Sequence, residues 1–125
     1  MKSPILKLGP YLIASLQAEL TDTDMLDLQS TLVEQVGRFR SKGVILDVTT
    51  LDVMDSFATR TLRHIAQAVG LRGAAAVIVG IRPDVAFAMV QLGLDQRLSG
   101  VHTVLDLEEA IALLDQQKPG ALRHD

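Results

Sequence analysis

Residues 43–69 read GVILDVTTLDVMDSFATRTLRHIAQAV, and this stretch decides the fold because it passes from a strand pattern to a helix pattern. Val44 to Val48 is apolar apart from Asp47, which is typical of a strand covered by helices on both faces. After a polar turn at 49–55, apolar residues recur at three- and four-residue intervals, which predicts a helix. Its expected buried residues are Ala58, Leu62, Ile65 and Val69.

Towards the N-terminus, a predicted hairpin comes before the first helix. Two apolar runs, at 5–8 and 11–16, flank Gly9-Pro10, a turn signal that predicts short antiparallel strands. A helix follows, and Thr21, Asp22 and Thr23 are candidates for its N-terminal cap. The apolar face expected for this helix consists of Met25, Leu28, Leu32, Val36 and Phe39.

Towards the C-terminus, strands and helices continue to alternate. Strands are expected at 74–79 and 101–105, with helices at 85–92, introduced by Pro83, and from Asp106 onwards. The buried residues expected in the closing helix are Leu107, Ile111 and Leu114. Parallel strands must be joined by long crossover connections, and the helices predicted between these strands are long enough to serve as those connections.

The sequence therefore predicts one α/β domain. Its sheet is mixed and mostly parallel, with an N-terminal antiparallel edge strand and about four helices. We assign residues 1–117 to this domain and residues 118–125 to a flexible polar tail.

Composition restricts the classes of function. Hydrophobic residues make up 48% of the 125-residue chain and charged residues 22%, as in a globular domain. The formal net charge of −3 gives no electrostatic reason to expect nucleic acid as a partner. No apolar run is long enough to cross a membrane and no signal peptide is recognisable, so we expect a cytoplasmic protein.

No cofactor, metal or catalytic site is expected. The chain contains no cysteine, and His64, His102 and His124 are too far apart for a metal-ligand pattern. The turn from Gly80 to Pro83 matches neither common phosphate-binding glycine motif. A small hydrolase built on Ser56 would need a general base, and the sequence places none beside it.

Ser56 is the candidate functional residue, because it lies directly before the second helical pattern. One interpretation is that its hydroxyl caps the helix. The other is that it accepts a phosphate, which the positive end of a helix stabilises and which adds about −1.5 to −2 charges beside Asp52 and Asp55. The two interpretations are compatible.

Arg60 lies four residues after Ser56, which is one helical turn, and is a candidate partner for a phosphate on Ser56. Arg63 and Gln67 continue the same polar face, so a solvated helix surface is the alternative interpretation.

Three segments carry a resemblance to a known family. They are GVILDV at 43–48, DSFATR at 55–60, and VGIRPDV at 79–85 with QLGL at 91–94. Over nearly the whole chain, the sequence resembles the STAS-domain family of anti-sigma-factor antagonists and stressosome proteins. Within that family it is most similar to the RsbS-like stressosome scaffolds.

The resemblance implies a non-enzymatic role in stress-response signalling. A scaffold of this kind assembles with RsbR-type sensors into a large complex, and it also forms homo-oligomers. It holds an RsbT-type serine/threonine kinase until the acceptor serine, here Ser56, is phosphorylated, and an RsbX-type phosphatase resets it. Five residues are expected to bind partners, namely Asp52, Asp55, Phe57, Arg60 and Arg82.

Alternatives remain open at this point. Sensors of the RsbR type carry a second acceptor near the first helix, where this chain aligns Asp22 between Thr21 and Thr23. A free SpoIIAA-like antagonist is the alternative within the family, although Asp-Ser-Phe-Ala at 55–58 departs from its usual motif. A phospho-aspartate receiver using Asp47 is a remote alternative, since the acidic cluster and lysine of that class are missing.

Overall fold

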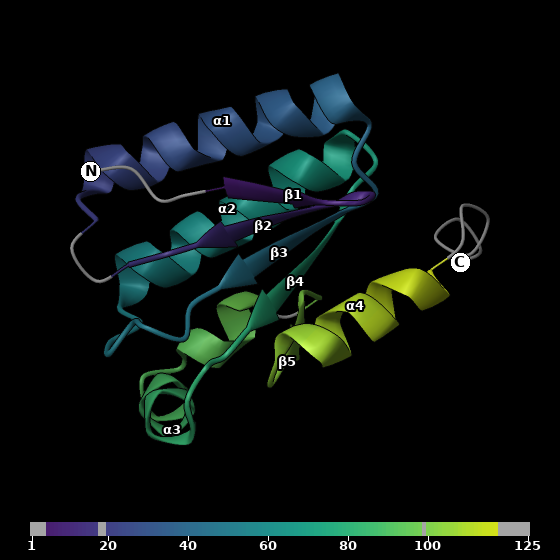
Figure 1. Cartoon of the computed structure of the whole chain (residues 1–125). Helices are drawn as coiled ribbons and strands as arrows, with labels where there is room; N and C mark the ends of the chain where they lie inside the picture. The colour runs from purple at the N-terminus through teal and green to yellow at the C-terminus, as the bar shows by residue number, and fades with distance from the viewer. Residues whose placement is uncertain (1–4, 18–19, 99, 118–125) are drawn as a thin grey trace.

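The computed structural model describes residues 5–17, 20–98 and 100–117 (Figure 1). The predicted tail at 118–125 and His124 lie outside the described residues. Five strands are described, β1 (Ile5–Leu8), β2 (Tyr11–Ser15), β3 (Gly43–Asp47), β4 (Ala75–Val79) and β5 (His102–Val104). The helices are α1 (Asp22–Phe39), α2 (Ser56–Leu71), α3 (Pro83–Gln91) and α4 (Leu107–Gln116), with a 3₁₀ helix at Leu94–Leu98.

The strands form one sheet in the order β1-β2-β3-β4-β5. The β1–β2 pair is antiparallel and the other pairs are parallel, which confirms the predicted mixed sheet with an antiparallel edge. Helices α1 and α2 lie on one face of the sheet, and α4 lies on the other (Figure 1). The carboxyl ends of the parallel strands share one edge, where ligands and reactive groups gather in open α/β sheets.

Two apolar clusters hold these layers together. The larger lies between the sheet and helices α1, α2 and α3, and it contains the predicted face of α2, including the fully buried Leu62, Ile65 and Val69. The smaller lies under α4 and contains Ala110 and Leu114. Burial of these side chains is the main stabilising contribution to such a fold.

Two predicted core residues lie at the surface instead. Phe39 is 41% exposed because it is the last residue of α1, and its ring contacts the cationic groups of Lys7 and Arg38. Leu107 is 40% exposed because it is the first residue of α4, a turn before the helix packs fully on the sheet.

The helix boundaries follow local chemistry. Thr21 caps α1 in a capping box with Asp24, which confirms the predicted cap region. Helix α3 begins at Pro83 rather than residue 85, because proline is well suited to a first helical position. The 3₁₀ helix was not predicted, since five residues are too few to show a period. None of the described helices is long and apolar enough to cross a membrane.

Helix α4 is also tied to the sheet by a polar contact. The Tyr11 hydroxyl of β2 donates a hydrogen bond to an Asp115 carboxylate oxygen of α4. Burial of the phenol, together with this hydrogen bond and the nearby negative charge, raises the pKa of Tyr11 from 10.0 to about 12.

This contact predicts a pH-dependent loss of stability. A raised pKa in the folded state means that folding favours the protonated phenol, so its contribution is intact below pH 10.0 and is lost as the pH rises towards about 12. Chemical unfolding of the wild type and Tyr11→Phe across this range measures the effect. The wild type should lose more stability than the variant, and parallel curves would show that Tyr11 is not responsible.

Candidate functional site

The candidate site is the loop that joins β3 to α2 at the carboxyl edge of the sheet. Its first residue, Val48, continues the parallel pairing because its N–H donates to the Val79 carbonyl at 2.9 Å. The Thr50 hydroxyl donates to the Leu16 carbonyl at 2.9 Å, and Met54 is buried in the core. The loop is therefore attached at its beginning, middle and end.

A close packing contact shapes the beginning of the loop. The Asp47 carboxylate accepts hydrogen bonds from the Thr49 backbone N–H at 2.9 Å and from the Thr49 hydroxyl at 2.6 Å. Gly80 follows β4 with a φ of +89°, and a Cβ there would lie 2.1 Å from the Thr49 hydroxyl oxygen. Only glycine fits this conformation and this distance without rearrangement.

Asp55, rather than Ser56, caps α2. The Asp55 carboxylate accepts a hydrogen bond from the Ala58 backbone N–H at 2.8 Å, and Ser56 is the first helical residue. The interpretation of Ser56 as the cap is therefore wrong. Aspartate and serine are both favoured capping residues. Asp55 is the cap because its carboxylate reaches the backbone N–H of Ala58, the third residue of the helix.

The Ser56 side chain is left available. The residue is exposed, and its hydroxyl makes no hydrogen bond to any residue that the structure describes. It lies in the first turn of α2, where the helix dipole favours negative charge. A group added to this hydroxyl would not displace the cap.

The division of roles between Asp55 and Ser56 predicts different effects on stability. Asp55→Ala removes the cap and should lower the free energy of unfolding by about 1 kcal/mol. Ser56→Ala removes no hydrogen bond to the described residues and should change it by less than about 0.5 kcal/mol. Urea unfolding of both variants tests this, and a larger loss for Ser56→Ala would contradict the assignment.

The loop also contacts the turn that precedes α3. Arg82 and Asp52, both predicted as partner-binding residues, form a salt bridge with 2.7 Å between guanidinium nitrogen and carboxylate oxygen. The Asp52 side chain is 77% exposed, so solvent screens the pair and it contributes little to stability. The Arg82 guanidinium partly offsets the negative charge of Asp52, close to the turn that contains Ser56.

Phe57 and Arg60 form a second pair on the first turn of α2. The Arg60 guanidinium lies 5.9 Å from the centre of the Phe57 ring. Phe57 is half-buried and packs against the larger apolar cluster, whereas Arg60, Arg63 and Gln67 are exposed as predicted. Arg60 is therefore held on the same side of the turn as Phe57.

The start of α1 reaches the same loop, a proximity that sequence patterns did not indicate. A hollow of about 130 Å³ lies between them, lined by residues from both segments that include Asp22, Met25, Asp55 and Phe57. The Thr21 hydroxyl accepts the Asp24 backbone N–H at 3.1 Å and so serves as a cap. The carboxylates of Asp22 and Asp55 make this surface acidic.

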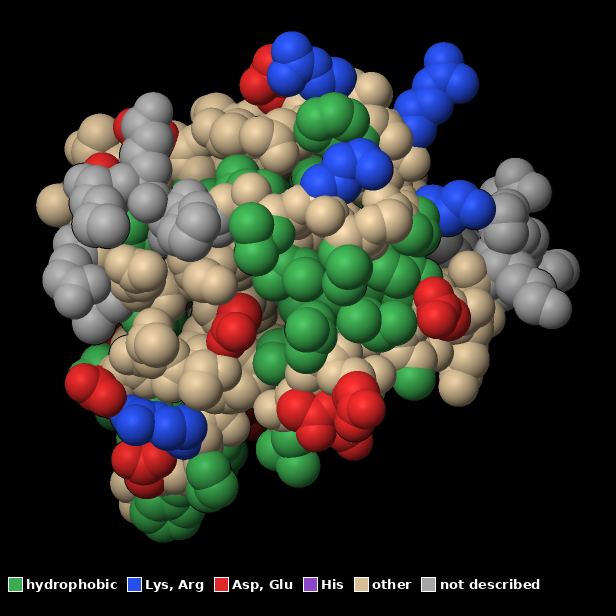
Figure 2. All heavy atoms as spheres, viewed as in Figure 1, with side chains coloured by type: hydrophobic (Ala, Val, Ile, Leu, Met, Phe, Trp, Pro, Cys, Tyr) green, Lys and Arg blue, Asp and Glu red, His purple; other side chains and the backbone are tan. Residues whose placement is uncertain are grey.

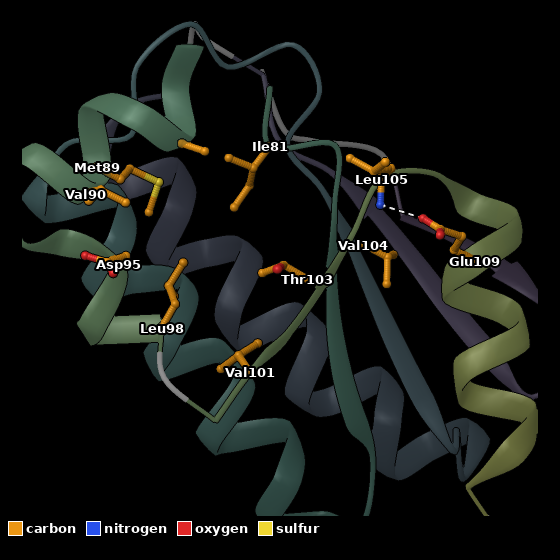
Figure 3. Close-up of a pocket in the computed structure, with 11 residues that line it drawn as sticks. Ile81, Met89, Val90, Asp95, Leu98, Val101, Thr103, Val104, Leu105 and Glu109 are labelled. Atoms are coloured by element: carbon orange, nitrogen blue, oxygen red, sulfur yellow. Dashed lines mark hydrogen bonds between the residues drawn. The ribbon is translucent and has the colours of Figure 1, made fainter. Parts of the chain in front are cut away.

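A second cavity, of about 450 Å³, lies between α3, the 3₁₀ helix and β5 (Figure 3). Its lining is mainly apolar, and Asp95 and Glu109 are its two acidic residues. Glu109 accepts a hydrogen bond from the Leu105 backbone N–H at 2.9 Å. The described lining holds no serine or histidine, and its hydroxyl-bearing residue is Thr103.

Among the described residues, no group of three or more histidine, aspartate or glutamate side chains is arranged to hold a metal ion. Asp47, the candidate of the receiver alternative, is occupied by its two hydrogen bonds from Thr49.

Comparisons with known proteins agree with this architecture. The model of the STAS domain family matches residues 5–110. The RsbT co-antagonist protein RsbRA of Bacillus subtilis is 34% identical over 84 residues, which cover 67% of this chain and 30% of that protein. The chain thus spans less than a third of the length of RsbRA, and the same holds for RsbRD of that organism, which is 29% identical.

Solved structures similar to this chain also come from stressosome proteins. A Ser-to-Glu variant of RsbS from Moorella thermoacetica superposes with a TM-score of 0.76 at 31% identity, covering 92% of this chain and 96% of that chain. A component of the stressosome superposes with a TM-score of 0.75 at 33% identity, covering 90% and 96%. Together with the mixed sheet and the loop before α2, these matches show that the chain belongs to the STAS domain family.

Proposed function

We propose that this chain is a non-enzymatic scaffold and phosphoswitch of a cytoplasmic stressosome. Unmodified, it holds an RsbT-type serine/threonine kinase in an assembly with RsbR-type sensors. Phosphorylation of Ser56 releases the kinase to a stress-response pathway, and an RsbX-type phosphatase resets the switch. The stressosome component and the RsbT co-antagonist among its relatives support this role.

One observation carries the proposal, namely the exposed Ser56 hydroxyl on the first turn of a helix that Asp55 caps. A kinase can reach this oxygen without unfolding the helix. The dipole of α2 stabilises the added phosphate, and the cap survives because it belongs to another residue. The modification therefore changes the charge of the surface and leaves the fold intact.

The charge change is large for this surface. A phosphate adds about −1.5 to −2 charges next to Asp55, on a loop whose other acid, Asp52, is already paired with Arg82. Val53, which lies between those two acids, is 69% exposed and gives a partner an apolar contact. A kinase that docks over Val53 and Ser56 would lose this contact through repulsion and desolvation.

The site assignment can be tested by phosphorylation in vitro. The wild type and Ser56→Ala are incubated with the RsbT-type kinase and ATP, and the modified peptide is identified by mass spectrometry. We expect one phosphate in the peptide that contains Ser56 and none in the variant. Modification of Thr21 or Thr23 with Ser56 untouched would overturn the assignment.

Assembly can be tested separately, by size-exclusion chromatography of the chain mixed with an RsbR-type partner. A scaffold elutes in a particle far larger than either protein alone. Separate elution would favour a free antagonist of the SpoIIAA type.

Arg60 is expected to stabilise the phosphate, since it lies one helical turn after Ser56 and is held beside Phe57. Loss of one charge-assisted contact in Arg60→Ala should weaken kinase recognition or accelerate dephosphorylation by roughly fivefold. Arg63→Ala is the matched control, because Arg63 is also an exposed arginine of α2, about one turn further on. Unchanged phosphorylation, dephosphorylation and kinase binding in Arg60→Ala would exclude this role.

A further inference from the structure

A cavity runs along the free edge of β5. In the described sheet this strand pairs only with β4, so no further strand covers its other edge. The cavity is the one of about 450 Å³ in Figure 3, and we call it the β5 groove. Residues of α3, the 3₁₀ helix, β5 and the start of α4 line it. Its volume lies within the range of small-molecule binding sites.

The wall of the β5 groove is mainly apolar. Met89 and Leu98 are buried and belong to the larger apolar cluster, so the core holds them in place. Val90 and Leu105 also line the groove, and they are 59% and 73% exposed. Apolar side chains that face solvent in a concave surface favour a ligand with an apolar body.

Two carboxylates flank this apolar wall, and they are the charged side chains of the described lining. Figure 3 shows Asp95 at one end of the groove, on the side of Leu98, and Glu109 at the other end, beside Leu105. The Asp95 carboxylate forms no hydrogen bond or ion pair with the residues that the structure describes. The Glu109 carboxylate accepts the Leu105 N–H at 2.9 Å, which fixes its position. The groove therefore presents negative charge at both ends.

Further acidic side chains surround the Glu109 end. The first turn of α4 contains Glu108 and Glu109, and it follows the capping residue Asp106. Figure 2, viewed as in Figure 1, shows red Asp and Glu side chains gathered near the start of α4, apart from the blue Lys and Arg side chains of this face. A cation is therefore attracted to this end of the groove.

We propose that the β5 groove binds a small aliphatic diamine. The methylene groups of the ligand pack on the apolar wall, and its two ammonium groups pair with the carboxylates of Asp95 and Glu109. An amine with one charge would use one carboxylate, and a neutral molecule would use neither. Both acidic residues are exposed, so solvent screens each pair and the expected affinity is modest, in the millimolar range.

A titration of the isotopically labelled full chain, followed by its amide NMR signals, tests the ligand class. Hexamethylenediamine is the probe, and hexylamine and hexanediol are matched ligands with one charge and none. We expect saturable shifts at Leu98 and Thr103, about fivefold weaker binding of hexylamine, and no binding of hexanediol. A series from trimethylenediamine to octamethylenediamine should show one preferred length, because the two carboxylates have a fixed spacing.

Charge variants test the two ends of the groove. Asp95→Asn and Glu109→Gln keep the shape of the side chains, and the new amide oxygen of the second variant can still accept the Leu105 N–H. Each variant should weaken binding of the preferred diamine by about fivefold. Glu108→Gln is the matched control, because Glu108 is an exposed neighbour that does not line the groove, and its effect should be less than about twofold.

A steric variant tests the middle of the groove without a change of charge. Thr103→Tyr should fill it and abolish diamine binding, whereas His102→Tyr, one residue earlier on β5 and outside the lining, should not. The absence of saturable shifts, equal binding of hexylamine, an equal loss in Glu108→Gln, or full binding by folded Thr103→Tyr would each overturn the proposal. Ser56 does not line the groove, so these results are independent of the phosphoswitch.

Discussion

Ser56→Asp is expected to weaken binding of the RsbT-type kinase by at least about tenfold, whereas Ser56→Ala retains the kinase. The aspartate places a negative charge beside Asp55 at the point where the kinase docks in our proposal. The alanine variant keeps the surface neutral and cannot be phosphorylated. Both variants should stay folded, because Asp55 holds the cap of α2.

Binding of immobilised variants to the kinase measures the difference. Ser30→Asp is the matched control, since Ser30 is an exposed serine on α1, away from the loop. It should bind the kinase as the wild type does. Equal binding by Ser56→Asp and Ser56→Ala would show that charge at this position does not release the kinase.

Gly80→Ala, in the turn after β4 that packs against the loop, is expected to lower the free energy of unfolding by about 2 kcal/mol or more, the largest loss among the variants around the loop. The new Cβ would lie 2.1 Å from the Thr49 hydroxyl oxygen and 3.2 Å from the Thr49 Cα, and the φ of +89° disfavours any side chain. Moving the Thr49 side chain aside would break its hydrogen bond to Asp47. The thermal midpoint should fall by roughly 8 °C.

Two controls separate steric from conformational strain. Gly70→Ala lies in α2 with nothing within 4 Å of the added Cβ, and it should stabilise the helix by about 0.5–1 kcal/mol. Thr49→Ala combined with Gly80→Ala should recover part of the loss, because it removes the clashing hydroxyl. Wild-type stability of Gly80→Ala alone would contradict the packing around the loop.

Local patterns were sufficient to predict the architecture. The helical spacing of Leu62, Ile65 and Val69 and the apolar run before Asp47 correspond to α2 and β3, and both are buried as expected. Periodicity works here because each element packs one face on a shared core. It misplaced Phe39 and Leu107, since a period does not reveal where a helix passes beyond the sheet.

The site was only partly predictable. The sequence indicated the junction at Ser56 but not that Asp55 is the cap, because two favoured capping residues are adjacent there. It selected both Asp52 and Arg82 without indicating that they pair, since they are 30 residues apart and meet only through the fold. The approach of Asp22 to the loop is likewise a tertiary contact without a local signal.

The decisive experiment is a two-dimensional amide NMR spectrum of the isotopically labelled chain before and after complete reaction with the kinase. A phosphate taken up by Ser56 without disturbance of the fold should shift the amide signals of Ser56, its neighbours in the loop and the first turn of α2, while the signals of core strands β3 and β4 stay in place. An unshifted Ser56 signal, or changes spread through the whole sheet, would contradict a switch that acts through one hydroxyl on an intact fold.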